Sequence, residues 1–203
     1  MSSGEAAAAA RPLRADAVRN RARILAAANE AFAAEGLAVP VDVIAERAGV
    51  GVGTVYRHFP TKEALGAAIL TTKVEALIAE ADRLAADADD PGGALEDYLA
   101  ALLTEGTACS ALAGAFSEAG YDLKSAAPDL EPQMTAALGR LLERAQETGV
   151  VRPEVRPTDL LALIGAACMV AGRPDRDAES GRRLLAVVTA GLRSPAATDT
   201  ASR

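Results

Sequence analysis

A short segment of the chain, residues 51–62, collects side chains that can form hydrogen bonds with DNA. Its polar members are Thr54, Tyr56, Arg57, His58 and Lys62. A threonine can bond to a base edge or touch a thymine methyl group, and Tyr, His and Lys can donate to phosphate oxygens. Gly53 would let the backbone approach a groove closely. This chemistry favours nucleic-acid binding.

Catalytic and metal-binding alternatives find less support in the same residues. His58 is the only histidine, so a cluster of histidine ligands is excluded and a Ser-His-Asp site would have to use this residue. The glycines at 49, 51 and 53 lack the spacing and the Lys-Ser/Thr ending of a phosphate-binding loop. We predict no catalytic residue, no metal and no cofactor. The first alternative to a DNA-binding function is an enzyme built on a helical scaffold.

The residues around this segment are expected to form two short helices joined by a tight turn. Residues 41–48 carry apolar side chains on one face, and Gly49 ends that helix. Residues 54–59 form the second short helix, which stops before Pro60. A longer amphipathic helix over 15–35 precedes both. This order is a helix-turn-helix, in which the second short helix enters the major groove.

Five short runs give this region a specific pattern. They are Ile44-Ala45, Ala48-Gly49-Val50, Gly53-Thr54-Val55-Tyr56, His58-Phe59 and Lys62-Glu63-Ala64-Leu65. In this order, within residues 41–65, they closely resemble the DNA-binding signature of the TetR family of transcriptional regulators. The chain departs from that signature at Gly51, where many members have Ser, and at Val41 and Asp42.

The resemblance implies roles for individual residues. Val52, Gly53 and Thr54 match base-facing positions, and Tyr56, His58 and Lys62 match phosphate-contacting positions. We add Gly51 and Arg57 to the expected DNA contacts. Because residues 51–53 offer few side-chain hydrogen bonds, we expect Arg57 to contribute more than usual to base readout.

Charge is distributed unevenly along the chain. The net charge is -7, yet residues 1–65 hold eight Lys and Arg against seven Asp and Glu. The excess of acidic residues therefore lies in the chain after residue 65. A cluster of arginines, the basic footprint expected of a DNA-binding head, comprises Arg11, Arg14, Arg19, Arg21 and Arg23. We expect Arg14 to be a DNA contact. A solvated helix face is the alternative interpretation of this cluster.

The rest of the chain favours helices throughout. Ala dominates the apolar residues and aromatic residues make up 3%, a composition that suits packed helices better than sheets. Helices are expected at 61–88, 93–107, 109–120, 128–149, 157–172 and 178–193. The expected fold is therefore all-α, with about nine helices: a three-helix helix-turn-helix head joined by a long helix to an antiparallel bundle.

The expected division of the chain is linear. A flexible basic arm covers 1–12, the DNA-binding domain 13–60, a ligand-binding and dimerisation domain 61–193, and a disordered tail 194–203. The longest uncharged apolar stretch, residues 160–172, is short of the roughly 20 residues needed to cross a bilayer. Two cysteines 59 positions apart suggest no disulfide. We expect a cytoplasmic protein without a membrane partner.

The last two helices are expected to pair two copies of the chain. Residues 160–171 are apolar on nearly all sides and must be covered on all sides. A second stripe for the same interface is Leu184, Leu185, Val188 and Leu192. We predict a homodimer through about 157–172 and 178–193; an interior helix of a monomer is the alternative.

By resemblance to the family, the helical bundle binds a small-molecule effector. Residues that could line a cavity between its helices are Tyr98, Leu102, Phe116, Tyr121, Met134, Leu138 and Cys168, with ordinary core packing as the alternative for each. The resemblance implies a repressor that leaves a roughly palindromic double-stranded operator when the effector binds. Activation, and a helical interaction protein whose head no longer binds DNA, are the other possibilities.

Overall fold

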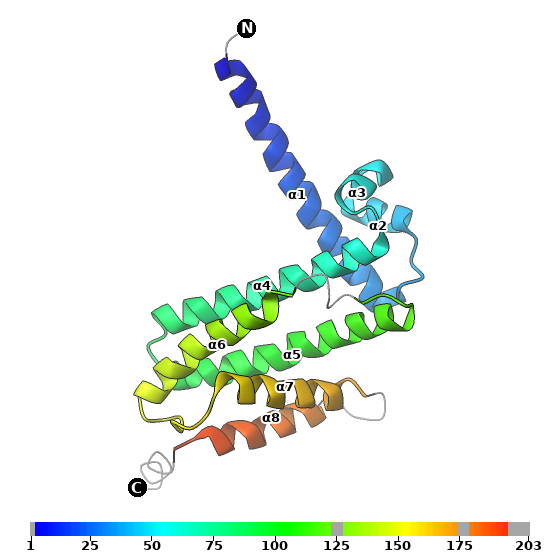
Figure 1. The fold of residues 1–203 in the computed structure, drawn as a ribbon. Helices are drawn as coiled ribbons and strands as arrows, with labels where there is room; N and C mark the ends of the chain where they lie inside the picture. Colours follow the sequence, from blue (N-terminus) through cyan, green and yellow to red (C-terminus); the bar gives the residue numbers. More distant parts are fainter. Residues whose placement is uncertain (1–2, 123–127, 174–178, 195–203) are drawn as a thin grey trace. The chain divides into compact units, whose positions relative to one another are not determined.

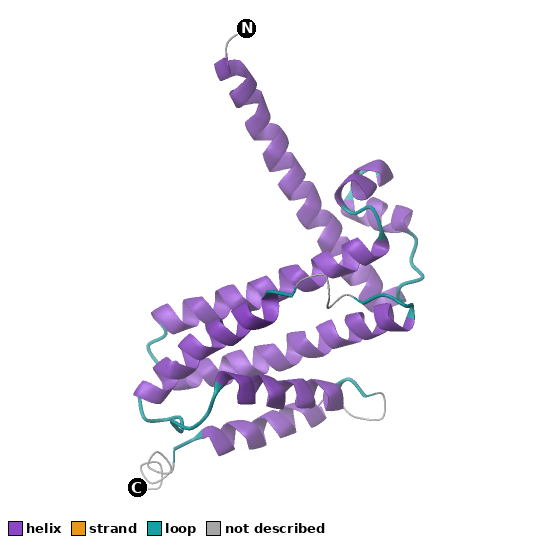
Figure 2. Cartoon of the chain, viewed as in Figure 1, coloured by secondary structure: helices purple, strands orange, loops and turns teal. Residues whose placement is uncertain are grey.

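The computed structural model describes residues 3–122, 128–173 and 179–194, with side chains from Ala15 onward (Figure 1). In this part of the chain every regular element is a helix (Figure 2), which confirms the all-α class. The eight described helices are α1 (Ser3–Glu35), α2 (Val41–Ala48), α3 (Val52–His58), α4 (Lys62–Asp87), α5 (Pro91–Glu118), α6 (Leu130–Glu147), α7 (Pro157–Ala171) and α8 (Glu179–Leu192).

The chain forms two compact units. The first, which we call the head, comprises Met1–Ile69 and Leu112–Ala126; the second, the body, comprises Leu70–Ala111 and Ala127–Arg203. The grouping is not the linear division expected from the sequence, because the last turns of α5 belong to the head. Helices α4 and α5 each contribute residues to both units.

Two helices differ markedly in length from those expected, and α3 begins two residues earlier than expected, at Val52 instead of Thr54. Helix α1 begins at Ser3 instead of residue 15 and includes most of the arm predicted to be flexible, because the alanines at 6–10 have the highest helix propensity of any residue. Helix α5 is continuous where two helices were expected. Its Gly106 is a packing position: a Cβ there would lie 2.9 Å from the Cys168 sulfur of α7, so glycine permits the close approach.

The head is organised by one stripe of α1. Ile24, Ala28 and Phe32 recur every four residues and are buried, as expected for one face of a helix. Against this face pack the buried side chains of the two short helices, including Ile44 and Val55. Helices of seven or eight residues are not stable alone, so α1 holds them in place.

The body has a continuous apolar core drawn from all five of its helices. Its largest fully buried members include Tyr98, Leu99, Leu138 and Leu142. Among the described helices α5 alone is long and apolar enough to cross a membrane by length and composition. Five of its apolar residues, Leu95, Tyr98, Leu99, Leu102 and Leu103, are buried in this core.

Candidate functional site

The turn between α2 and α3 is closed by backbone hydrogen bonds. Gly49 ends α2 in the left-handed conformation (φ 62°). Its N–H donates to the Glu46 oxygen at 2.9 Å, and the N–H of Val50 donates to the Ala45 oxygen at 3.0 Å, the pairing of a Schellman motif. The Gly51 oxygen then accepts from the Thr54 N–H at 2.8 Å. The start of α3 is thereby fixed within three residues of the end of α2.

Helix α3 has a buried side and an exposed side. Val55 and the following Phe59 are 1% and 4% exposed and anchor the helix on the head. Val52 and Tyr56, also four residues apart, face outward and are 39% and 50% exposed. Of the remaining expected contacts, Gly51, Gly53 and Arg57 are exposed, and Thr54 and His58 are partly buried. The predicted base-facing and phosphate-facing residues of α3 therefore lie at the surface.

Lys62 has an intramolecular partner that the sequence did not indicate. Its Nζ donates to the Leu37 oxygen in the loop after α1 at 2.9 Å, in a partly buried position. This bond ties the start of α4 to the end of α1. Arg14, the other expected contact outside α3, belongs to α1, but its side chain lies outside the described residues.

The start of α4 combines an N-cap residue, Thr61, with the carboxylate of Glu63 in the first turn. Thr61 Oγ1 accepts from the Ala64 N–H at 3.1 Å, as an N-cap does. A hydrogen bond from the Thr61 side chain lowers the pKa of Glu63, and a bond from the Tyr121 hydroxyl and the charge of Lys62 act in the same direction. The same bond to Glu63 raises the pKa of Tyr121. The segment after α5 is therefore joined to α4 within the head.

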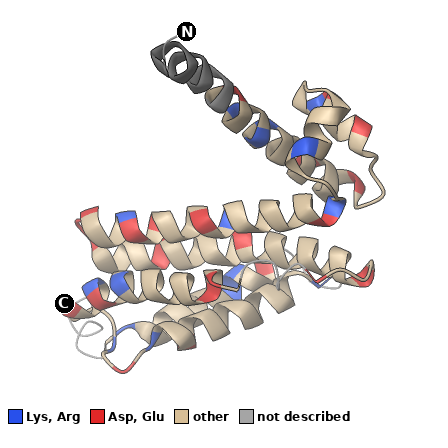
Figure 3. Ribbon diagram, turned by 45° about the horizontal axis from the view of Figure 1, so that its top comes forward, with Lys and Arg blue, Asp and Glu red and all other residues tan. Residues whose placement is uncertain are grey.

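The arginines of α1 contact other parts of the head. Arg19 pairs with Asp16 on the same helix. Arg23 Nη2 donates to the Gly49 oxygen at 2.7 Å, and the Arg21 guanidinium lies 5.2 Å from the centre of the Phe59 ring. Figure 3 shows that basic residues recur along α1 in this unit. Sequence reasoning grouped these arginines by charge and missed their partners, which lie 26 and 38 positions away.

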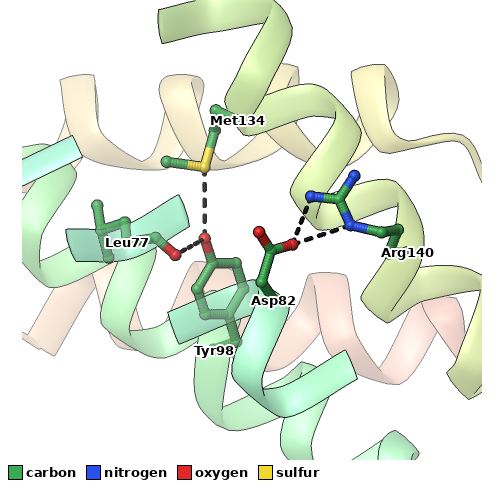
Figure 4. A network of polar contacts seen from close by, with 5 residues as sticks. All are labelled: Leu77, Asp82, Tyr98, Met134 and Arg140. Carbon is green, nitrogen blue, oxygen red and sulfur yellow. Dashed lines mark hydrogen bonds and ion pairs between the residues drawn. The ribbon is translucent and has the colours of Figure 1, made fainter. Parts of the chain in front are cut away.

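The expected pocket residues divide between the two units. Tyr98, Leu102, Met134, Leu138 and Cys168 belong to the body core. Tyr98 Oη donates to the Leu77 oxygen at 2.9 Å and lies 3.3 Å from the Met134 sulfur (Figure 4), and burial raises the pKa of this hydroxyl. Beside it, Arg140 pairs with Asp82.

Phe116 and Tyr121, the other two expected pocket residues, belong to the head. Phe116 is 1% exposed and meets Phe32 edge to face, with ring centres 5.7 Å apart. The centre of the Tyr121 ring lies 6.3 Å from that of Phe116. Phe116 thus completes the core of the head beneath α1.

An apolar surface lies on α7 and α8, which pack against each other in the body. We call it the α7–α8 face; its large exposed members are Leu163, Met169, Leu184 and Val187. The stripe expected on α8 is mostly internal, because Leu185 and Leu192 are buried and Val188 is partly buried. The regularly spaced residues of that stripe mostly face the core of the body. Val187, which is not part of the stripe, is exposed.

Comparison with known proteins places both units in one family. Residues 24–69 match the model of bacterial regulatory proteins of the tetR family, and residues 90–194 match the C-terminal domain of SbtR-like transcriptional regulators. Among solved structures, a TetR transcription regulatory protein from Mycobacterium vanbaalenii is 43% identical, with 90% of this chain and 99% of that chain covered and a TM-score of 0.73.

A second solved structure gives a similar result. A TetR transcriptional regulator from Streptomyces coelicolor is 34% identical, with 86% of this chain and 99% of that chain covered and a TM-score of 0.70. No curated protein matches the chain significantly.

Proposed function

Because this chain belongs to the TetR family of bacterial transcriptional regulators, we propose that it is a sequence-specific repressor released from its operator by a small molecule. The observation that carries the proposal is the outward face of α3. Val52, Tyr56 and Arg57 are exposed there, on a helix that Val55 and Phe59 anchor from behind. A short, firmly anchored helix with exposed side chains suits insertion into a major groove.

Different side chains of this face are proposed to contact bases and phosphates. Val52 offers an apolar contact for a thymine methyl group, and Thr54 a hydroxyl for a base edge. Arg57 can form two parallel hydrogen bonds to a guanine. Tyr56, His58, Lys62 and Arg14 complete the proposed set as phosphate contacts, with Gly51 and Gly53 allowing close backbone approach. Lys62 already donates one hydrogen bond to Leu37, so only its remaining N–H donors can bind a phosphate.

A second copy of the chain is the proposed partner of the α7–α8 face. Met169 and Val187 are 76% and 72% exposed, and large apolar side chains exposed on two helices that pack together favour an interaction site. A two-fold axis through this face would pair α7 and α8 with their equivalents and present two copies of α3. The operator should then be roughly palindromic, with half-sites about one helical turn apart.

The effector site is proposed in the body, around Tyr98, Met134 and the other core residues predicted from the sequence there. A ligand shifts the protein between two conformations only through different affinities for them. We propose that it favours a conformation in which α4, shared by both units, carries the two heads out of register. The regulator acts in the cytoplasm, and we assign it no enzymatic activity.

The test begins with an operator selected from a random DNA pool by the purified protein. Fluorescence anisotropy then measures its affinity for the wild type, for Arg57→Ala and for Arg83→Ala. Arg83 is a matched control because it is an exposed arginine of the body paired with Glu80. Arg57→Ala should lose discrimination at one base pair by about 1–3 kcal/mol, and Arg83→Ala should not. Equal discrimination in all three proteins would exclude α3 as the reading element.

Ligand release is tested on the same complex. A library of small molecules is screened for those that raise the thermal stability of the protein, since a ligand of the folded state stabilises it. A repressor of the proposed kind loses operator affinity with such a ligand; a ligand that tightens operator binding would show an activator or co-repressor instead. Failure to select any DNA at low salt would favour an interaction protein.

A further inference from the structure

The turn before α3 and the residue after α3 are each contacted by an arginine of α1. Arg23 bonds to the Gly49 oxygen at the turn that leads into α3, and Arg21 lies over the ring of Phe59, the residue that ends it. Arg21 is exposed and lies one turn before the buried Leu25, because the two residues are four positions apart. Arg23 lies on the flank of the same helix. Both contacts are formed within the head.

In the turn before α3, Arg23 donates a hydrogen bond to the backbone oxygen of Gly49. The N–H groups of Gly49 and Val50 are used in closing α2, and the Gly49 oxygen accepts from the Arg23 guanidinium instead. Gly49 is also the residue that leaves room for this contact. A Cβ at that position would displace Nη2 of Arg23, so the left-handed conformation requires the glycine and its lack of a side chain leaves the guanidinium in place.

After the end of α3, Arg21 covers Phe59. The ring of Phe59 is almost fully buried, and it follows directly after the last residue of α3. A guanidinium within about 6 Å of an aromatic ring centre is attracted to its face, and it also covers the ring from water. Arg21 therefore packs on the residue that joins the end of α3 to the segment before α4.

We propose that Arg21 and Arg23 are positioning residues for operator recognition, which set the pose of α3, and that neither neutralises a phosphate. The proposal rests on α3 being the reading element. Both arginines belong to the basic cluster that charge alone assigns to the DNA backbone. The geometry gives them another role, because the Arg23 guanidinium contacts Gly49 in the turn before α3 and the Arg21 guanidinium contacts Phe59, the residue after α3.

The two roles differ in a measurable way. A side chain that neutralises a phosphate contributes to specific and non-specific binding alike, and its removal lowers the slope of log affinity against log salt by about 0.9. A positioning residue contributes only where base contacts must be aligned. Its removal lowers operator affinity and leaves the salt slope and the affinity for unrelated DNA unchanged.

The experiment measures operator and unrelated DNA, each over a range of salt, for Arg23→Ala, Arg21→Ala and Arg19→Ala. Arg19 is the control because it is an exposed arginine of the same helix, paired with Asp16 and not with the ends of α3. We expect the ratio of operator to unrelated affinity to fall about tenfold in Arg23→Ala, as for a lost hydrogen bond to a charged group, and about two- to fivefold in Arg21→Ala, as for a lost cation–π contact at an exposed site. The ratio should be unchanged in Arg19→Ala.

Two results would overturn the proposal. A loss of slope by about 0.9, with equal losses on both DNAs, would make the arginine a phosphate contact. A fall in melting temperature with an unchanged ratio would make it a stabilising residue only. If wild-type protein shows no preference for any operator, the proposed function fails before the arginines are tested, so the two failures are distinguishable. Circular dichroism confirms that each variant is folded.

Discussion

The α7–α8 face provides the most quantitative prediction, the substitution Met169→Glu. Three quarters of the Met169 side chain is exposed, and burying a whole methionine contributes about 1.5–3 kcal/mol. Burial in a partner therefore contributes about 1–2 kcal/mol for each copy. In a two-fold interface the change occurs twice, so the dimer should lose at least about 2–4 kcal/mol. The dimer dissociation constant should rise about 30- to 1,000-fold.

Sedimentation equilibrium over a range of protein concentrations measures this constant directly. Val187→Glu should act similarly, since Val187 is 72% exposed on the same face. Val18→Glu is the matched control because Val18 is 69% exposed but lies on α1. The variants should keep the wild-type circular dichroism, because the changed side chains are outside the core. Wild-type dissociation constants for both Met169→Glu and Val187→Glu would refute dimerisation through this face.

Three further predictions concern stability. Phe116→Ala should lower the free energy of unfolding by about 3–5 kcal/mol, because Phe116 is buried against Phe32; a loss below about 1 kcal/mol in urea denaturation would contradict its place in the head core. Gly49→Ala should destabilise by about 1–2 kcal/mol for the left-handed backbone alone, whereas Gly114→Ala, with open space around it inside α5, should be neutral or stabilising by up to about 1 kcal/mol. Tyr98→Phe should cost about 1 kcal/mol near neutral pH for the lost hydrogen bond. Because burial raises the pKa of Tyr98, the folded state holds this proton more tightly than the unfolded state, so the advantage of the wild type should shrink as pH rises above about 10; an advantage that grows with alkaline pH would show the opposite sign.

The parts of the head that follow local rules could be predicted from the sequence. The spacing of Val55 and Phe59, the glycine after α2 and the proline after α3 define the short helices without reference to the rest of the chain. What the sequence could not show is which distant groups meet. Lys62 bonds to a carbonyl 25 positions away, and Phe116, predicted for a pocket, packs on Phe32. Such contacts depend on how helices cross and leave no local pattern.

The spacing of apolar residues predicted where the helices lie better than which of their faces are buried. Leu185 and Leu192 form the most regular stripe of α8, and that stripe is used by the body's own core. Leu184, also predicted for the interface, is exposed, and so is Val187, which was not among the predicted residues. The break expected between the helices 93–107 and 109–120 is absent, because α5 is continuous, and within it Gly106 fits a close helix crossing at Cys168.

Chemical footprinting of the selected operator tests the central claim most directly, that paired α3 helices read DNA. Wild-type protein should protect guanine N7 atoms in the major groove at two sites about one helical turn apart, arranged as an inverted repeat. In Arg57→Ala the protection should weaken at the same position of both half-sites. Protection of a single site, protection confined to the minor groove, or no protection at low salt would contradict the account.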